Sequence, residues 1–289
     1  MSDFPAMDPM DHPYLEPDLY RGAANNIPPM LAYDGGQVGT LTVRAGSVTA
    51  ERHRPRRNDN ESFTVWTDRD GSVCLLAVAG AVGDGENAGR AARMATALAV
   101  QASRRRLAST APASGADLAA LVRAVTGDID AMLHSRASGP DYLTTLLLGF
   151  VPTVVAPGGS VPAVVGRVGG LMAWRIRAGT VDPVFSLADP GSPGTGGAPP
   201  QVAALPGHGD ALEVRTVTLS DGEVLALTTG GLASGVRGER VTGFLGPLWT
   251  VPPTPLEFLA SLAVRRNDRD DDRTAAVAWL GHHESRPGR

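Results

Sequence analysis

The sequence contains no lysine: all 26 of its basic residues are arginine, set against 30 aspartate and glutamate residues. Without lysine, the chain cannot build the phosphate-binding loop of nucleotide hydrolases or a Schiff base with a carbonyl cofactor. Its net charge of −4 argues against a nucleic-acid partner, because neutralising a phosphate backbone needs clustered cations. We therefore expect neither lysine-dependent chemistry nor nucleic-acid binding.

Cysteine is nearly absent as well, because Cys74 is the only one in the chain. A single cysteine excludes an internal disulfide and a zinc site made of cysteines. Cys74 stands inside an apolar run, which indicates a buried core thiol rather than a nucleophile.

Long apolar runs are also missing. No run approaches the roughly 20 residues that cross a bilayer, and the N-terminal residues lack a basic-then-apolar signal pattern. A hydrophobic content of 43% over 289 residues is enough for a sizeable core. We expect a cytoplasmic globular protein with no membrane contact.

The distribution of proline and glycine indicates the domain organisation. Residues 1–36 are rich in proline and show no hydrophobic period, so we expect an irregular N-terminal arm. Residues 37–281 form the predicted domain, interrupted by a Pro/Gly-rich loop at 188–210. A polar tail, 282–289, follows.

Periodicity predicts the elements of this domain. A half-buried strand is expected over 38–50, and 62–67 and 72–78 form a hairpin around an Asp-Gly turn. Helices are expected over 89–107, over 114–134 with Ser114 as its N-cap, and over 255–264. Further strands are expected over 142–155, 161–168, 171–179, 181–187, 212–219, 223–228 and 274–280. This order does not alternate strand and helix, so it predicts an α+β fold of two packed antiparallel sheets flanked by helices, an α-β-β-α sandwich.

A series of separated segments has a recognisable order: RRNDNESF (56–63), LLAVAGAVGDGENAGRAA (75–92), LTTL (143–146), VGGLMAWRI (168–176), TGGL (229–232) and DDRT (271–274). Together they resemble the motifs of the protein phosphatase 2C family, the metal-dependent serine/threonine phosphatases. In that family two metal ions activate a water molecule that attacks the phosphorus. The resemblance therefore implies the sandwich fold and a site built from several aspartates.

At the positions that the resemblance assigns to metal-binding aspartates, this sequence carries other residues. Glu61 and Asp271 are carboxylates, whereas Ala79, Gly170 and Gly230 supply no side-chain oxygen. Two divalent cations held close together need several hard oxygen ligands. We expect Glu61 and Asp271 to be residual ligands at most, with no cofactor bound.

An alternative register remains open. Asp84 belongs to a literal Asp-Gly pair near the expected place, and it could replace the missing aspartate of the strand. Together with Glu61 and Asp271 it would then hold Mn²⁺ or Mg²⁺ in an active phosphatase. This register does not restore an acid at Gly230.

The densest positive cluster lies just before Glu61 and includes Arg52, Arg56 and Arg57. Arginine suits bidentate phosphate contact, so these residues are candidates for binding phosphate or a partner. We expect a catalytically degenerate phosphatase-like protein that binds a phosphoprotein, a kinase or another regulatory partner. The alternatives are the active enzyme above and a subunit of a larger assembly that uses the arm 1–36 and the loop 188–210 as contacts.

Overall fold

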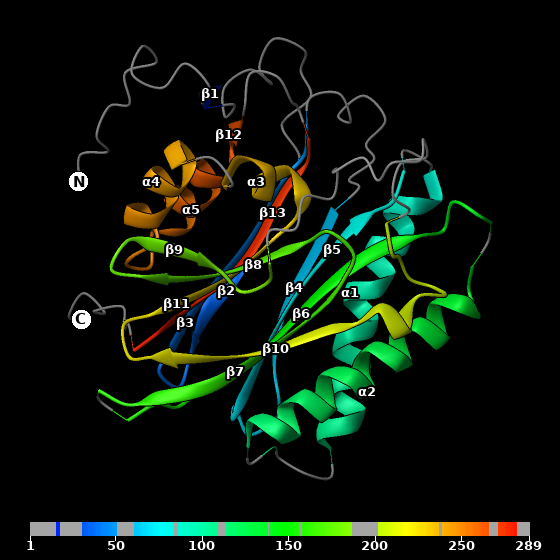
Figure 1. Ribbon diagram of the computed structural model, residues 1–289, viewed down its shortest axis with the longest axis horizontal. Helices are drawn as coiled ribbons and strands as arrows, with labels where there is room; N and C mark the ends of the chain where they lie inside the picture. The colour runs from blue at the N-terminus through cyan, green and yellow to red at the C-terminus, as the bar shows by residue number, and fades with distance from the viewer. Residues whose placement is uncertain are drawn as a thin grey trace.

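A computed structural model describes residues 16–17, 31–50, 61–83, 86–108, 112, 114–137, 139–156, 158–186, 202–236, 239–265 and 271–281. Within these ranges, two antiparallel β-sheets pack face to face and helices cover both outer faces (Figure 1). The predicted α+β sandwich is confirmed.

The first sheet has five strands in the order β10-β7-β6-β5-β4. Its strands are β4 (Glu61–Thr67), β5 (Val73–Ala81), β6 (Thr144–Pro152), β7 (Ser160–Val168) and β10 (Glu213–Ser220). The predicted hairpin joins β4 to β5, with the N–H of Gly71 donating to the carbonyl of Asp68 at 3.0 Å. Gly71 has a φ of +64°, a conformation that glycine adopts without a steric penalty.

The second sheet has six strands in the order β2-β3-β13-β11-β8-β9. Its strands are β2 (Leu31–Val38), β3 (Leu41–Val48), β8 (Met172–Arg177), β9 (Thr180–Pro183), β11 (Val224–Thr228) and β13 (Arg273–Leu280). A short separate pair joins β1 (Glu16–Pro17) to β12 (Val264–Arg265).

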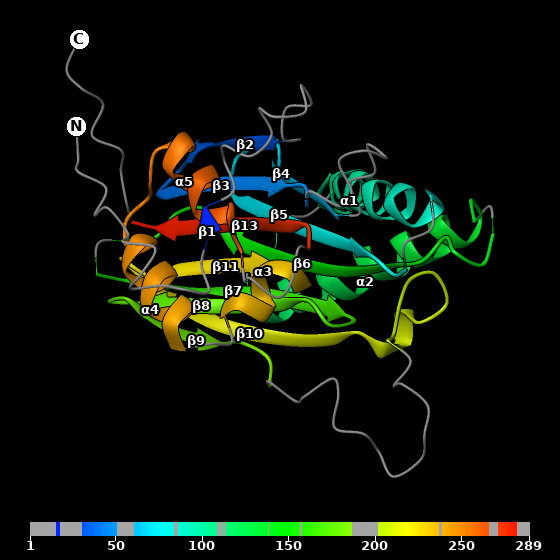
Figure 2. The same cartoon turned by 90° about the horizontal axis from the view of Figure 1, so that it is seen from above.

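Helices α1 (Glu86–Leu107) and α2 (Gly115–His134) lie on the five-stranded sheet, and α3 (Gly230–Val236), α4 (Glu239–Leu248) and α5 (Pro255–Leu262) lie on the six-stranded sheet (Figures 1 and 2). A 3-10 turn spans Gly209–Ala211. The Ser114 hydroxyl caps α2 by accepting the N–H of Asp117, as predicted. We expected one late helix; the structure adds α3 and α4. None of the helices in the described ranges is long and apolar enough to cross a bilayer.

Alternating side chains of β5 show how the layers are built. Leu75 and Ala77 pack towards α1 and α2, whereas Leu76 and Val78 pack between the sheets. Successive side chains of a strand point to opposite faces, so a strand buried on both faces is apolar throughout. A third cluster, with Trp249, fills the space under α4 and α5.

Two expectations about the N-terminal part are corrected. The strand β2 begins at Leu31, so residues 31–36 are extended rather than irregular. The segment expected as one half-buried strand over 38–50 is instead the end of β2, a turn and β3, and β3 is buried along its whole length because α5 covers its outer face. Residues 188–201 and 282–289 lie outside the described ranges, and residues 202–210 form no strand or α-helix.

Candidate functional site

The hairpin of β4 and β5 sets the register of the candidate site. Glu61 at the start of β4 lies opposite Gly80 of β5, and Gly80 in turn lies opposite Thr145 of β6. Directly opposed residues point to the same face of a sheet. Glu61, Gly80 and Thr145 therefore share the face that is turned towards the second sheet.

This register corrects the position of the missing aspartate in the strand. We expected it at Ala79, directly after the strand expected over 72–78. The strand continues to Ala81, and the Ala79 methyl group is fully buried against the helices α1 and α2. Because Gly80 points to the opposite face, Gly80 is the position at which a carboxylate would reach the site.

Glu61 is tied to the second sheet by a hydrogen bond. The hydroxyl of Thr229, which directly follows β11, donates to Glu61 Oε2 at 2.6 Å. This length is typical of a hydroxyl bound to a carboxylate. Thr229 is fully buried and Glu61 is 9% exposed, so the bond lies in the interior and joins the two sheets.

A short chain of hydroxyl groups extends this link into the six-stranded sheet. The Thr274 N–H donates to Thr229 Oγ1 at 3.0 Å, and the Thr274 hydroxyl donates to Ser47 Oγ at 2.7 Å. Buried polar groups cost free energy unless they are hydrogen-bonded. The hydrogen bonds from Glu61 to Ser47 satisfy these groups in the interior between the two sheets.

The other two substituted positions lie in open space. A Cβ atom placed on Gly170 or on Gly230 meets no atom of the described residues within 4 Å, and neither glycine has a positive φ. A Cβ atom on Gly80 meets Thr145 Oγ1 at 3.2 Å and a methyl group of Leu171 at 3.6 Å. Neither backbone conformation nor crowding requires glycine at Gly170 or Gly230.

Asp271 lies at the same end of the sandwich. A Cβ atom on Gly231 would lie 3.0 Å from Asp271 Cβ, which places Asp271 beside the start of α3. Its neighbour Asp272 has a different role, since Asp272 Oδ1 accepts the N–H of Ala50 at 2.6 Å. Glu61 and Asp271 therefore each lie next to a residue of the segment 229–231, and their role as residual ligands stays a prediction.

These residues do not fit a pair of metal ions. The described part of the chain contains no group of three or more His, Cys, Asp or Glu side chains able to hold an ion. Glu61 also already accepts a hydrogen bond from Thr229. Two hard cations a few ångströms apart need more carboxylate oxygens than Glu61 and Asp271 provide.

The remaining predicted site residues lie outside the described ranges. They are Asp84, the alternative ligand, and the arginines proposed to contact phosphate or a partner, Arg52, Arg56 and Arg57. Their roles stay predictions.

Thr229 and Thr145 are the site residues that the sequence interpretation missed. One signal was available for the face: counting outward from the Asp68–Gly71 turn pairs Glu61 with Val78, which has the same orientation as Gly80 and not that of Ala79. The observed register lies two residues further along, with Glu61 opposite Gly80. No comparable signal marks Thr229, because its bond to Glu61 joins residues 168 positions apart.

Comparisons with solved structures agree with this architecture. The serine/threonine phosphatase of S. agalactiae matches with a TM-score of 0.57 at 14% identity, over 83% of this chain and 99% of that one. The Mycobacterium tuberculosis serine/threonine phosphatase PstP/Ppp matches with a TM-score of 0.52 at 20% identity, over 87% and 98%. RsbX, solved in complex with magnesium, matches with a TM-score of 0.53 at 13% identity, over 86% and 100%.

No protein-family model and no curated protein sequence matches the chain. At these identities the structural likeness establishes the fold: the chain has the phosphatase 2C-like fold over nearly the full length of those phosphatases.

Proposed function

We propose that this chain is a catalytically degenerate phosphatase 2C-like protein that acts by binding a phosphoprotein, a kinase or another regulatory partner. The observation that carries the proposal is the combination of missing side-chain oxygens and a hydrogen-bonded Glu61 at the site. Gly80, Gly170 and Gly230 supply no side-chain oxygen, and Glu61 is hydrogen-bonded across the sheets to Thr229.

The physical argument concerns charge. A hydrolytic centre with two metals holds two divalent cations about 4 Å apart, and their mutual repulsion must be offset by several carboxylates. Glu61 and Asp271 together bring at most two negative charges. A single hydrated ion between them would lack the second cation that stabilises the attacking and leaving oxygens.

The binding role draws on the arginines before β4. Arg52, Arg56 and Arg57 give a guanidinium-rich segment next to Glu61 in the sequence, and guanidinium groups bind phosphate through two parallel hydrogen bonds. A site that contacts phosphate without metals would retain a phosphorylated partner instead of hydrolysing it.

Hydrolysis is tested with p-nitrophenyl phosphate and either Mn²⁺ or Mg²⁺. We expect no turnover above the metal-free rate and no heat of Mn²⁺ binding by calorimetry. Metal-dependent turnover that Asp271→Ala abolishes would overturn the proposal and support the active enzyme with Glu61, Asp84 and Asp271 as ligands.

A gain-of-function variant makes the test sharper. The triple variant Gly80→Asp, Gly170→Asp and Gly230→Asp adds carboxylates where the backbone tolerates them, and we expect it to bind Mn²⁺. The matched control replaces the same glycines by asparagine, which has nearly the same volume and no charge. Equal Mn²⁺ binding by both triple variants would show that these positions are not the missing ligands.

The binding role has its own measurement, the affinity for a mixture of phosphoserine peptides compared with the same peptides lacking phosphate. We expect preference for the phosphorylated mixture, and we expect Arg52→Ala, Arg56→Ala and Arg57→Ala together to remove it. Equal affinity for both mixtures would contradict the phosphoprotein partner while leaving the hydrolysis result unchanged.

A further inference from the structure

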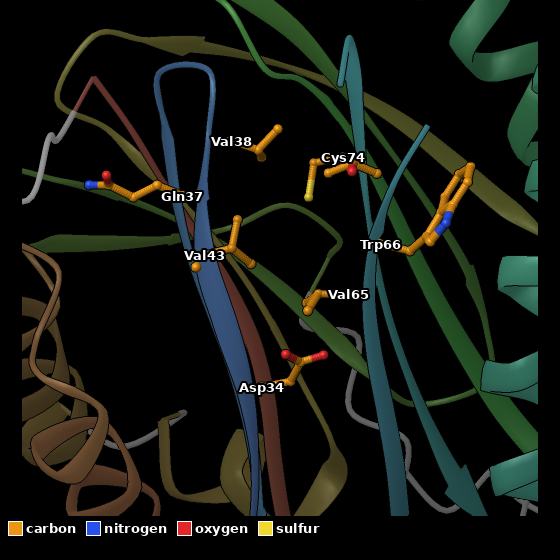
Figure 3. A pocket seen from close by; sticks show the side chains of 9 residues that line it. Asp34, Gln37, Val38, Val43, Val65, Trp66 and Cys74 are labelled. Atoms are coloured by element: carbon orange, nitrogen blue, oxygen red, sulfur yellow. The ribbon is translucent and has the colours of Figure 1, made fainter. Parts of the chain in front are cut away.

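A recess opens between the edges of the two sheets, where the hairpin of β2 and β3 faces β4 and β5 (Figure 3). Its volume is about 350 Å³, which lies within the range of ligand pockets. The lining residues are Asp34, Gly36, Gln37, Val38, Val43, Val65, Trp66, Thr67 and Cys74. In Figure 3 the Trp66 ring and the Gln37 side chain point away from the centre of the recess.

The recess exists because β2 carries little bulk on its inner face. Asp34, Gly36 and Val38 lie opposite Ala45, Val43 and Leu41 of β3, which belong to the core between the sheets. A Cβ atom placed on Gly36 meets no atom within 4 Å. The missing side chain of Gly36 thus leaves a hollow beside the apolar side chains of Val43 and Val65.

Asp34 adds one charge to the lining of the recess. Its Oδ1 accepts the N–H of Gly35 at 2.8 Å, and the carboxylate forms no ion pair with any residue in the described ranges. In Figure 3 the Asp34 carboxylate extends towards the side on which β4 and Val65 lie. Such a carboxylate favours a cationic group over a neutral or acidic one.

Both strands that flank the recess are sheet edges. β4 ends the five-stranded sheet and β2 ends the six-stranded sheet, and no strand of the described ranges pairs with their outer sides. The half-buried side chains of Phe63 and Val65 on β4 face the space between the sheets. An edge strand offers backbone N–H and C=O groups with which an extended peptide can pair.

The spacing of the two features on β2 matches such a peptide. Asp34 and Gly36 are two residues apart on one face, which corresponds to about 7 Å along a strand. Alternate side chains of an extended peptide have the same separation. A strand added beside β4 would direct one set of alternate side chains towards the inner face of β2.

We propose that β4 receives an extended segment of a partner protein, with an aliphatic side chain in the hollow at Gly36 and an arginine or lysine two positions away at Asp34. The proposed binding site is at Val65, which lies about 13 Å along β4 from Glu61. The proposal does not depend on whether the candidate site at Glu61 hydrolyses phosphate, so each proposal can fail alone.

The test uses the full chain and a fluorescent peptide of alternating threonine and valine with one arginine two positions from a valine. We expect Asp34→Asn to weaken its binding about tenfold, with no effect on a peptide in which leucine replaces the arginine. We expect Gly36→Leu to abolish binding of both peptides. The matched controls are Asp182→Asn on the opposite edge strand and Gly127→Leu on the exposed face of α2, and both should bind normally.

Hydrogen exchange locates the peptide. We expect the amides of β4 to gain protection when the peptide binds, while those of β10, the other edge of the same sheet, do not. Three outcomes would overturn the proposal. The first is protection of the β10 amides alone. The second is an equal affinity for butylammonium, which would indicate a small-molecule site. The third is no binding at millimolar peptide, which would leave Asp34 as a charge that protects an edge strand from pairing.

Discussion

The two ends of β4 show what a missing side chain does in two different surroundings. At Glu61, the glycine opposite is Gly80, and the space between the sheets is crossed by the bond from Thr229. Near Val65, the glycine facing β4 is Gly36, and a recess of about 350 Å³ stays open.

The difference follows from burial. Glu61 lies in the interior, where a carboxylate without a donor would be costly, so a hydroxyl from the second sheet satisfies it. Asp34 lies at an edge where water can solvate its free oxygen, so nothing in the fold needs to cover it. The missing side chain at Gly80 therefore lies beside a buried hydrogen bond between the sheets. The missing side chain at Gly36 leaves an accessible hollow at the sheet edge.

The largest expected effect tests whether the recess near Val65 reaches the sulfur of Cys74. Cys74 lines the recess but is only 1% exposed, and burial raises the pKa of its thiol from 9.0 to about 12. We expect Ellman's reagent at neutral pH to label the native chain at least about a hundredfold more slowly than the denatured chain, because the thiolate reacts. Equal rates would show that the recess extends to the sulfur.

The next effect tests the hydrogen bond at Glu61. Thr229→Val removes the hydroxyl that donates to Glu61 and accepts from the Thr274 N–H. We expect a loss of about 2 kcal/mol in the free energy of unfolding, measured with urea, because two buried polar groups lose a partner. Thr229→Ser keeps the hydroxyl and should lose less than half as much. Equal losses for both variants would mean that packing, not the hydrogen bond, accounts for the lost stability.

A smaller effect concerns a carboxylate held by a cation instead of a hydroxyl. Burial acts to raise the pKa of Glu223, but hydrogen bonds from Arg175 and the Ser220 N–H, with the charge of Arg177, lower it below 4.5 overall. A lowered pKa in the folded state gives stability that is present above pH 4.5 and is lost as the pH falls through the lower folded value.

We therefore expect Glu223→Gln to lower the free energy of unfolding by at most about 1 kcal/mol at neutral pH. The difference in this free energy between the variant and the unmodified chain should shrink as the pH falls below 4.5. The control is Asp128→Asn. The exposed Arg106 lowers the pKa of Asp128, and we expect this variant to lose less unfolding free energy than Glu223→Gln. If the stability difference between Glu223→Gln and the unmodified chain grew in acid, the lowered pKa of Glu223 would be contradicted.

The smallest effect compares the two glycines directly. Gly36→Ala adds a methyl group into empty space and restricts the unfolded chain, so we expect stabilisation of up to about 0.5 kcal/mol. Gly80→Ala places its methyl group 3.2 Å from Thr145 Oγ1, so we expect a slight loss. Thermal unfolding of both variants gives the two signs, and a loss at Gly36 would mean that the recess is smaller than described.

Local signals in the sequence were sufficient for much of the fold. The Asp-Gly turn predicted the hairpin of β4 and β5, and Ser114 predicted the start of α2, because turns and caps depend on neighbouring residues. The helices α3 and α4 were missed, since the glycine-rich residues 230–236 carry no clear helical period and are stabilised by packing on the six-stranded sheet.

For the candidate site, the sequence by itself determined that the segments resembling the metal motifs hold few carboxylates, because glycine and alanine bring no side-chain oxygen. The order of the segments also led us to expect Glu61 and Asp271 as residual ligands, and that role stays a prediction. Only the tertiary structure decided that Gly80 rather than Ala79 faces the site and that Thr229 binds Glu61. A shift of one residue turns a strand side chain to the other face, and a bond between two sheets depends on how the sheets pack.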